Sequence, residues 1–74
     1  MFSAVYVQRR NGLLYAYRDE FLNDDEDQTC AEEARIKLVD LLADEFELRR
    51  DLVWKDVTDT MNKFLREYGL EVLR

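Results

Sequence analysis

Two short runs of apolar residues near the start of the chain, separated by a turn dipeptide, predict a β-hairpin. Residues 2–8 and 13–18 are rich in β-branched and aromatic side chains, and Asn11-Gly12 lies between them. Asn-Gly adopts the two positive φ angles of a type I′ turn, the commonest two-residue hairpin connection. The register that follows gives one face of the hairpin three tyrosines and the other face small aliphatic side chains. The tyrosines are Tyr6, Tyr15 and Tyr17. Either face can be the buried one, which leaves the other available to a partner.

The period changes to that of a helix after residue 28. Thr29 and Glu32 have the spacing of a capping box, which predicts a helix over about 29–49. At 100° per residue its apolar positions cover more than half of the circumference. We therefore expect this helix to be covered on more than one side.

A second helix is predicted over 52–68, with one apolar stripe and a charged opposite face. The two apolar stripes are offset on a helical wheel, which favours a break near Arg50-Asp51, with Asp51 as N-cap of the second helix. Gly69 suits the C′ position with Leu70 folding back, and residues 70–73 alternate as a short third strand would. The sequence thus predicts one α+β domain over 1–74, a hairpin packed on two helices in the order ββαα. The end of the chain is compatible with a short third strand.

Acidic residues dominate the charge of the chain. Seventeen acids against eleven bases give a net charge of −6, which opposes attraction to nucleic acid or to anionic lipid and favours basic protein partners. Six of the acids fall within residues 19–27, and three more recur on the outer face of the first predicted helix. These candidate partner-binding carboxylates are Asp19, Glu20, Asp24, Asp25, Glu26, Asp27, Asp40, Asp44 and Glu47.

The residue types needed for most enzyme chemistry are missing. The chain has no histidine, one cysteine (Cys30), and two isolated glycines that cannot form a phosphate-binding loop. The acidic cluster lacks the alternate-residue spacing and the glycine of an EF-hand loop, so we expect no bound metal and no cofactor. The longest apolar run, residues 13–17, is far shorter than the roughly 20 residues of a membrane helix. A single cysteine fits a reducing compartment, and we expect a cytoplasmic protein.

Two functions fit these observations. The first is a non-enzymatic module that inhibits or modulates a basic nucleic-acid-handling protein, because rows of carboxylates can imitate a phosphate track. Small acidic inhibitors of phages and other mobile elements have this size and charge, which is an analogy only. The alternative is a homo-oligomeric assembly protein, such as a homodimer, formed through the wide apolar face of the first predicted helix. It requires that the fold leave the following residues uncovered: Ile36, Val39, Ala43 and Phe46.

Overall fold

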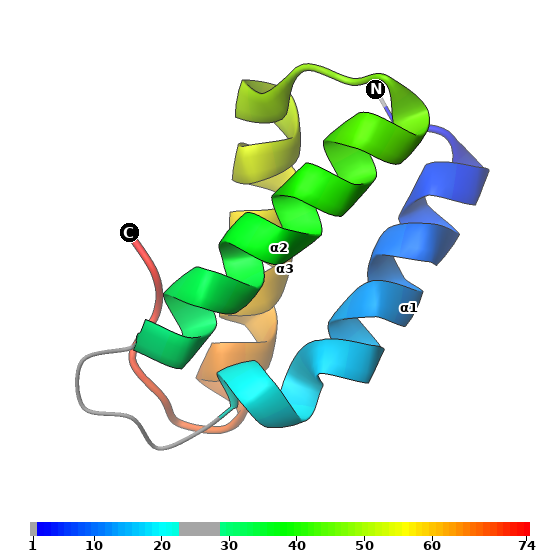
Figure 1. The fold of residues 1–74 in the computed structure, drawn as a ribbon. Coiled ribbons are helices and arrows are strands. Elements are labelled where there is room, and N and C mark those ends of the chain that lie inside the picture. The colour runs from blue at the N-terminus through cyan, green and yellow to red at the C-terminus, as the bar shows by residue number, and fades with distance from the viewer. Residues whose placement is uncertain (1, 23–28) are drawn as a thin grey trace.

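The computed structural model describes residues 2–22 and 29–74. They form three α-helices, α1 (Ala4–Phe21), α2 (Thr29–Phe46) and α3 (Arg50–Glu67), followed by an extended C-terminal segment (Figure 1). The central helix α2 packs against both α1 and α3. The part of the chain described contains no strand. The fold is therefore all-α, and the predicted α+β fold with an N-terminal hairpin is wrong.

Helix α1 occupies the region in which the sequence predicted the hairpin. Its buried residues are Tyr6, Leu13, Leu14 and Phe21, whose spacing of seven, one and seven positions places them on one side of a helix. A hairpin would have put Leu13 and Leu14 on opposite faces, whereas the helix buries both against its neighbours. The Ser3 hydroxyl caps the helix by accepting a hydrogen bond from the Tyr6 amide at 3.2 Å. Burial of these four side chains against α2 and α3 outweighs the local turn preference of Asn-Gly.

The Asn11-Gly12 pair lies in the middle of α1, on its exposed face. Gly12 does not have the positive φ that a type I′ turn needs, since Gly69 is the one glycine with positive φ among the described residues. A Cβ atom built on Gly12 would meet no other atom within 4 Å. Gly12 is thus a helix-interior glycine with free space around it.

We predict that Gly12→Ala stabilises the protein by about 0.5–1 kcal/mol, because alanine loses less backbone entropy in a helix interior. Denaturant unfolding followed by circular dichroism would measure the change. The same substitution in a type I′ turn would force alanine into a positive φ and destabilise the protein. A loss of stability would therefore contradict the helical assignment of residues 4–21.

Helix α2 begins at Thr29, as the capping-box spacing predicted, and ends at Phe46. The break between the helices covers residues 47–49, slightly before the predicted position. Glu47 has a φ of +52°, and the Leu48 amide donates to the Ala43 carbonyl at 3.0 Å, which closes the helix end. Arg49, without a side-chain cap, precedes α3, so the prediction of Asp51 as N-cap is wrong. Asp51 lies in the first turn, where a carboxylate interacts favourably with the positive end of the helix dipole.

The end of α3 was predicted correctly. Gly69 has a φ of +70°, and the Leu70 amide donates to the Leu65 carbonyl at 2.8 Å, which forms a Schellman motif. The third strand that the alternation of residues 70–73 allowed does not form: residues 70–74 are extended but belong to no sheet. Their alternation has another cause, because Leu73 is buried against the helices while Glu71 faces solvent.

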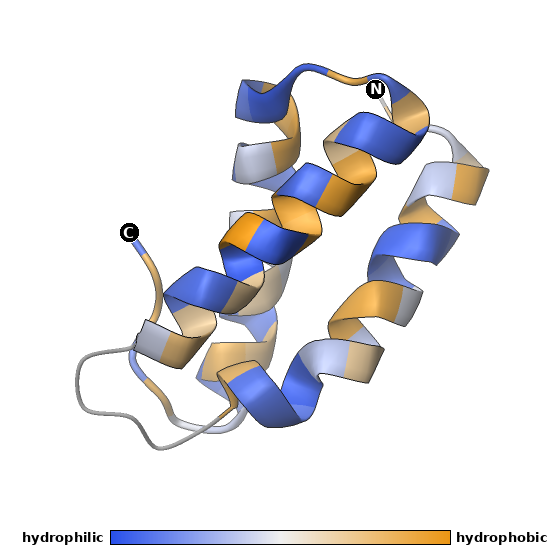
Figure 2. Ribbon diagram, viewed as in Figure 1, coloured by the Kyte–Doolittle hydropathy of each residue, from blue (hydrophilic) through white to orange (hydrophobic). Residues whose placement is uncertain are grey.

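One apolar core joins the three helices. The side chains with at most 1% exposure come from all of them, and hydrophobic residues recur between hydrophilic ones along each helix (Figure 2). They include Leu14 of α1, Leu38 and Leu42 of α2, and Val57 and Met61 of α3. The prediction that the first predicted helix is covered on more than one side is confirmed, since α1 and α3 both pack on α2. No described helix combines the length and hydrophobicity needed to cross a membrane.

Candidate protein-interaction surface

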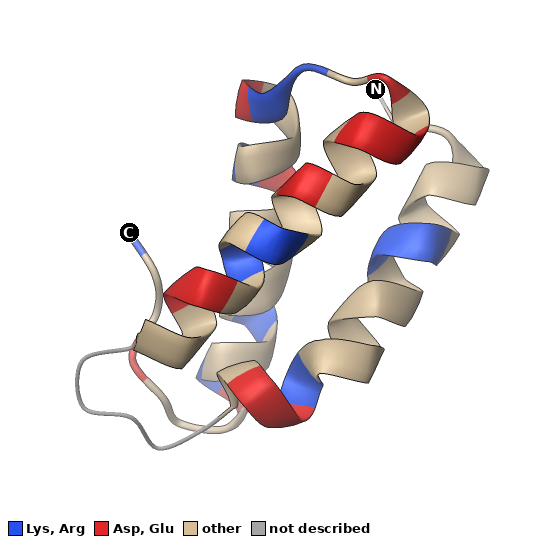
Figure 3. Cartoon of the chain, viewed as in Figure 1, with Lys and Arg blue, Asp and Glu red and all other residues tan. Residues whose placement is uncertain are grey.

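The negative charge of the protein is concentrated on α2 and on the segment that precedes it. Residues 24–46 contain nine acids and two bases, whereas the rest of the chain contains eight acids and nine bases. Arg35, one of the two bases, is buried and faces α3, so Lys37 is the single base on the exposed face of α2. Figure 3 shows the acidic side of α2 beside the mixed charges of α1 and α3. The outer face of α2 is therefore the most acidic described surface. Its carboxylates are Glu32, Glu33, Asp40, Asp44 and Glu45.

Two of these carboxylates are already paired with arginines from neighbouring elements. Asp40 forms an ion pair with Arg50 at the start of α3, and Glu45 accepts a hydrogen bond from Arg9 of α1 at 3.2 Å. Both pairs are about half-exposed, so each contributes little to stability. Glu33 and Asp44 have no described cation within ion-pair distance, and their charges remain available.

The predicted carboxylates gather at the two ends of α2. Asp19 and Glu20, exposed at the end of α1, line an open depression with Glu33 and Lys37. At the other end, Asp40 and Asp44 line a second open depression with Leu41, Leu48 and Arg50. Glu47 follows as an exposed residue after the end of α2. The remaining four, Asp24, Asp25, Glu26 and Asp27, lie outside the described residues.

The predicted tyrosine face does not exist, because it depended on the hairpin register. Tyr6 is buried, with 1% exposure, whereas Tyr15 is 61% exposed and Tyr17 is half-buried. Tyr6 and Tyr15 are nine positions apart, which places them about 180° apart around a helix. Because of its exposure, Tyr15 is the one of the three that offers an aromatic surface to solvent. The guanidinium of Arg18 lies over its ring, 4.2 Å from the centroid.

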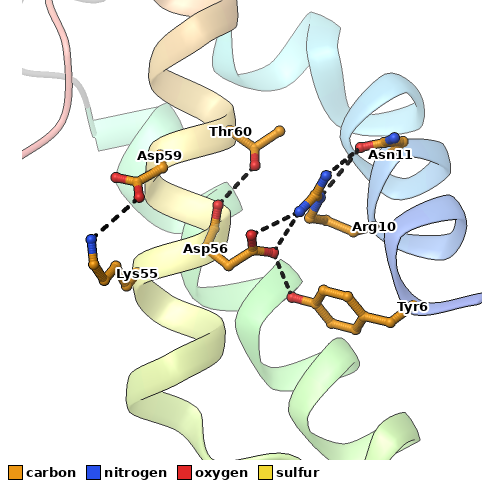
Figure 4. A network of polar contacts seen from close by, with 7 residues as sticks. All are labelled: Tyr6, Arg10, Asn11, Lys55, Asp56, Asp59 and Thr60. Carbon is orange, nitrogen blue, oxygen red and sulfur yellow. Dashed lines mark hydrogen bonds and ion pairs between the residues drawn. The ribbon is translucent and has the colours of Figure 1, made fainter. Parts of the chain in front are cut away.

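A polar network between α1 and α3 was not predicted from the sequence. The Tyr6 hydroxyl donates to Asp56 at 2.8 Å, and Arg10 donates to both oxygens of the same carboxylate at 2.7 and 2.8 Å (Figure 4). The Tyr6 ring also stacks on Phe2 and meets Phe46 edge-on. The spacing of Tyr6 and Arg10, four positions on one helix face, was the available signal. Their partner lies 46 positions beyond Arg10, out of reach of any local pattern.

Burial of Tyr6 raises the pKa of its phenol, and the hydrogen bond to the Asp56 carboxylate raises it further. An unfolded tyrosine ionises near pH 10, so above this pH the unfolded chain releases a proton that the folded protein retains. The Tyr6 contribution to stability is therefore constant at lower pH and declines as the pH rises above about 10. We predict that the free energy of unfolding, measured in urea at pH 8 and pH 10.5, falls less for Tyr6→Phe than for the wild type. Tyr15→Phe, which alters an exposed phenol, is the control, and a wild-type pH dependence in Tyr6→Phe would contradict the prediction.

A second unpredicted cluster lies where α2, α3 and the C-terminal segment meet. The Arg35 guanidinium lies over the Trp54 ring at 4.2 Å and donates to the Thr58 hydroxyl at 3.3 Å and to the Arg74 carbonyl at 2.9 Å. The Asn62 side chain bonds the backbone of Leu73. Burial lowers the pKa of Arg35, and the negative charge of Glu32 opposes that shift. An arginine inside the apolar pattern of the first predicted helix was the signal in the sequence.

Within residues 2–22 and 29–74, no group of three histidine, cysteine or acidic side chains is arranged to hold a metal ion. Comparison with known proteins found no matching family model, no similar curated protein and no similar solved structure.

Proposed function

We propose that the protein is a non-enzymatic acidic binding module that inhibits or modulates a basic, nucleic-acid-handling partner. The observation that carries the proposal is the outer face of α2, where five carboxylates accompany one lysine. Glu33, Asp40 and Asp44 lie on one side of the helix, seven and four positions apart, and form a row of carboxylates in which Lys37 is the single base. Such a row attracts a basic surface over long range and makes association depend on salt. With Asp19, Glu20 and the acids of residues 24–27, it forms the proposed contact surface.

The Arg50–Asp40 pair illustrates the contact that a partner would make. A guanidinium from the start of α3 already binds a carboxylate of this row. Partner arginines would bind Glu33 and Asp44 in the same way, since charge-assisted hydrogen bonds are the strong contacts in such interfaces. Leu41, 44% exposed beside Asp40 and Asp44, adds an apolar contact. We further propose a cytoplasmic location, which the single cysteine supports.

Paired variants of equal charge test this proposal. Glu33→Gln/Asp44→Asn removes two charges from the α2 row, and Asp59→Asn/Glu67→Gln removes two exposed charges from α3. Immobilised wild-type protein should capture nucleic-acid-binding proteins from a nuclease-treated lysate at about 50 mM salt and release them at about 500 mM, where screening is strong. The α2 variant should capture much less, and the α3 variant should resemble the wild type. A captured partner should then lose nucleic-acid binding when the protein is added. Equal losses in both variants, or a partner that still binds nucleic acid, would contradict the proposal.

The fold removes most of the support for the homo-oligomeric alternative. Val39 and Ala43 are buried by the helices of the same chain, with 0% and 8% exposure, and Phe46 is half-buried. Ile36, 46% exposed, is the one residue of the four that the fold leaves open. Light scattering at low and high salt should therefore report a monomer, whereas a salt-insensitive dimer would favour the alternative.

A further inference from the structure

The C-terminal segment, residues 70–74, lies on α2 and α3 as an extended peptide (Figure 1). Leu73 inserts its side chain between the helices and is 4% exposed. Its amide donates to the Asn62 side-chain oxygen at 2.7 Å, and its carbonyl accepts from the Asn62 side-chain nitrogen at 3.0 Å. Arg35 donates to the carbonyl of the next residue, Arg74, at 2.9 Å. These three hydrogen bonds are all made with the main chain of the segment.

This arrangement is how proteins recognise extended peptides of variable sequence. The paired bonds of Asn62 replace those of a neighbouring β-strand, so they can be made with almost any residue in an extended conformation. The site that holds the Leu73 side chain adds a preference for an aliphatic residue. Asn62 is 8% exposed, and its hydrogen bonds are therefore sheltered from water.

Arg35 provides independent evidence that the site can form a further hydrogen bond with a ligand. Its side chain is 9% exposed, and its Nε atom is buried without a hydrogen-bond partner. Its Nη1 donates to the Thr58 hydroxyl and to a main-chain oxygen of Arg74, and no described side-chain carboxylate forms an ion pair with it. A buried guanidinium nitrogen without an acceptor is costly, and a further acceptor oxygen would relieve that cost.

We propose that Arg35, Thr58 and Asn62 form a binding site for an extended segment of a partner protein, which residues 70–74 occupy in the free protein. The ligand is a segment with an aliphatic residue at the position of Leu73, followed by a carbonyl or carboxylate oxygen for Arg35. The site lies apart from the acidic face of α2 and does not depend on the proposed function. Gly69, with its positive φ, stands at the junction where the segment would separate from α3. Occupation by the chain's own segment lowers the apparent affinity for a partner by the fraction of open molecules.

Hydrogen exchange of the unmodified protein tests whether the segment opens by itself. The Leu73 amide should exchange at least ten times faster than the amide of Met61, which lies in the core of α3 and needs global unfolding. Equal protection of the two amides would mean that the segment leaves only when the protein unfolds, and would overturn the proposal.

Binding of a peptide added in trans tests the site directly. The probe is a fluorescent peptide of residues 69–74, Gly-Leu-Glu-Val-Leu-Arg, titrated against full-length Leu73→Ala, whose own segment is weakened. We expect the peptide to bind this variant at least ten times more tightly than the wild type. N-methylation of the peptide amide at the position of Leu73, which donates to Asn62, should weaken binding at least tenfold. Equal binding of the two peptides, or no binding to a Leu73→Ala protein with wild-type helical content, would overturn the proposal. A Leu73→Ala dimer in light scattering would overturn the assignment to a partner, because two copies would then be exchanging their segments. If the variant does not fold, hydrogen exchange decides.

Discussion

Replacing Asp56 by alanine should lower the free energy of unfolding by about 3 kcal/mol, because it leaves a largely buried arginine and a tyrosine hydroxyl without their shared acceptor. The Arg10 and Asp56 side chains are 14% and 18% exposed, and Asp56 accepts both Arg10 hydrogen bonds and the one from Tyr6. Net charge alone would lead to the opposite expectation, since the change removes an acid from a chain with a net charge of −6. Urea unfolding monitored by circular dichroism distinguishes the expected loss of stability from the gain that net charge alone would give.

Asp59→Ala is the matched control for this prediction. Asp59 lies on the same helix, and its exposed carboxylate pairs with Lys55 at 3.6 Å, a contact expected to contribute less than about 0.5 kcal/mol. Both substitutions place alanine in α3 and remove one charge, so helix propensity and net charge cancel in the comparison. Equal stability of the two variants would show that the network contributes nothing. The double variant Arg10→Met/Asp56→Leu should recover most of the loss, since it removes both charges together.

The two helices that the sequence predicted well are those in which local and long-range preferences agree. Thr29 begins α2 with a capping-box spacing, and Gly69 ends α3 in a Schellman motif, so the chain marks these boundaries locally. The single apolar stripe of α3 and the wide one of α2 correspond to their positions in the bundle, since α2 packs between the other two. Periodicity alone therefore indicated which helix is central.

The first element was mispredicted because a strong local signal competed with a weaker non-local one. Asn11-Gly12 favours a turn within a few residues, whereas the helical signal is spread from Tyr6 to Phe21 and is interrupted by polar positions. A two-stranded hairpin is marginal in water, while a helix of this length can bury one face along two partners. The spacing of Tyr6, Leu13 and Leu14 contained that information, but the Asp56 partner on α3 did not appear in any local pattern.

One part of the candidate surface could also be predicted from the sequence, and another part could not. The excess of acids in residues 24–46 is a property of composition and could be counted directly. The pairing of Asp40 with Arg50 and of Glu45 with Arg9 depends on how the helices pack, so it could not be predicted from the sequence. The tyrosine face was a consequence of the hairpin register, so it was lost with the hairpin. Charge carried by a whole segment is therefore a safer basis for a functional hypothesis than a face defined by an assumed register.

Replacing Phe21 by alanine should cost about 3–4 kcal/mol, which is in the range measured for removing a buried aromatic ring. Phe21 is the last residue of α1 and is 1% exposed, and its ring meets that of Phe64 on α3 edge-on, with 6.1 Å between centroids. It joins the end of α1 to α3 just before the acidic segment. A chain of 74 residues has a total stability of roughly 4–11 kcal/mol, so the variant should be close to unfolding at 37 °C.

Tyr15→Ala provides the comparison within the same helix. Tyr15 is 61% exposed and contacts Arg18 through its ring face, so its truncation should cost less than about 1 kcal/mol. Thermal unfolding of both variants, with helical content measured before heating, gives the difference. In the hairpin fold with its tyrosine face buried, Tyr15 would lie on a packed strand face and Phe21 would follow the second strand. A larger loss for Tyr15→Ala than for Phe21→Ala would therefore contradict the helical packing of α1, because only that packing buries Phe21 and exposes Tyr15.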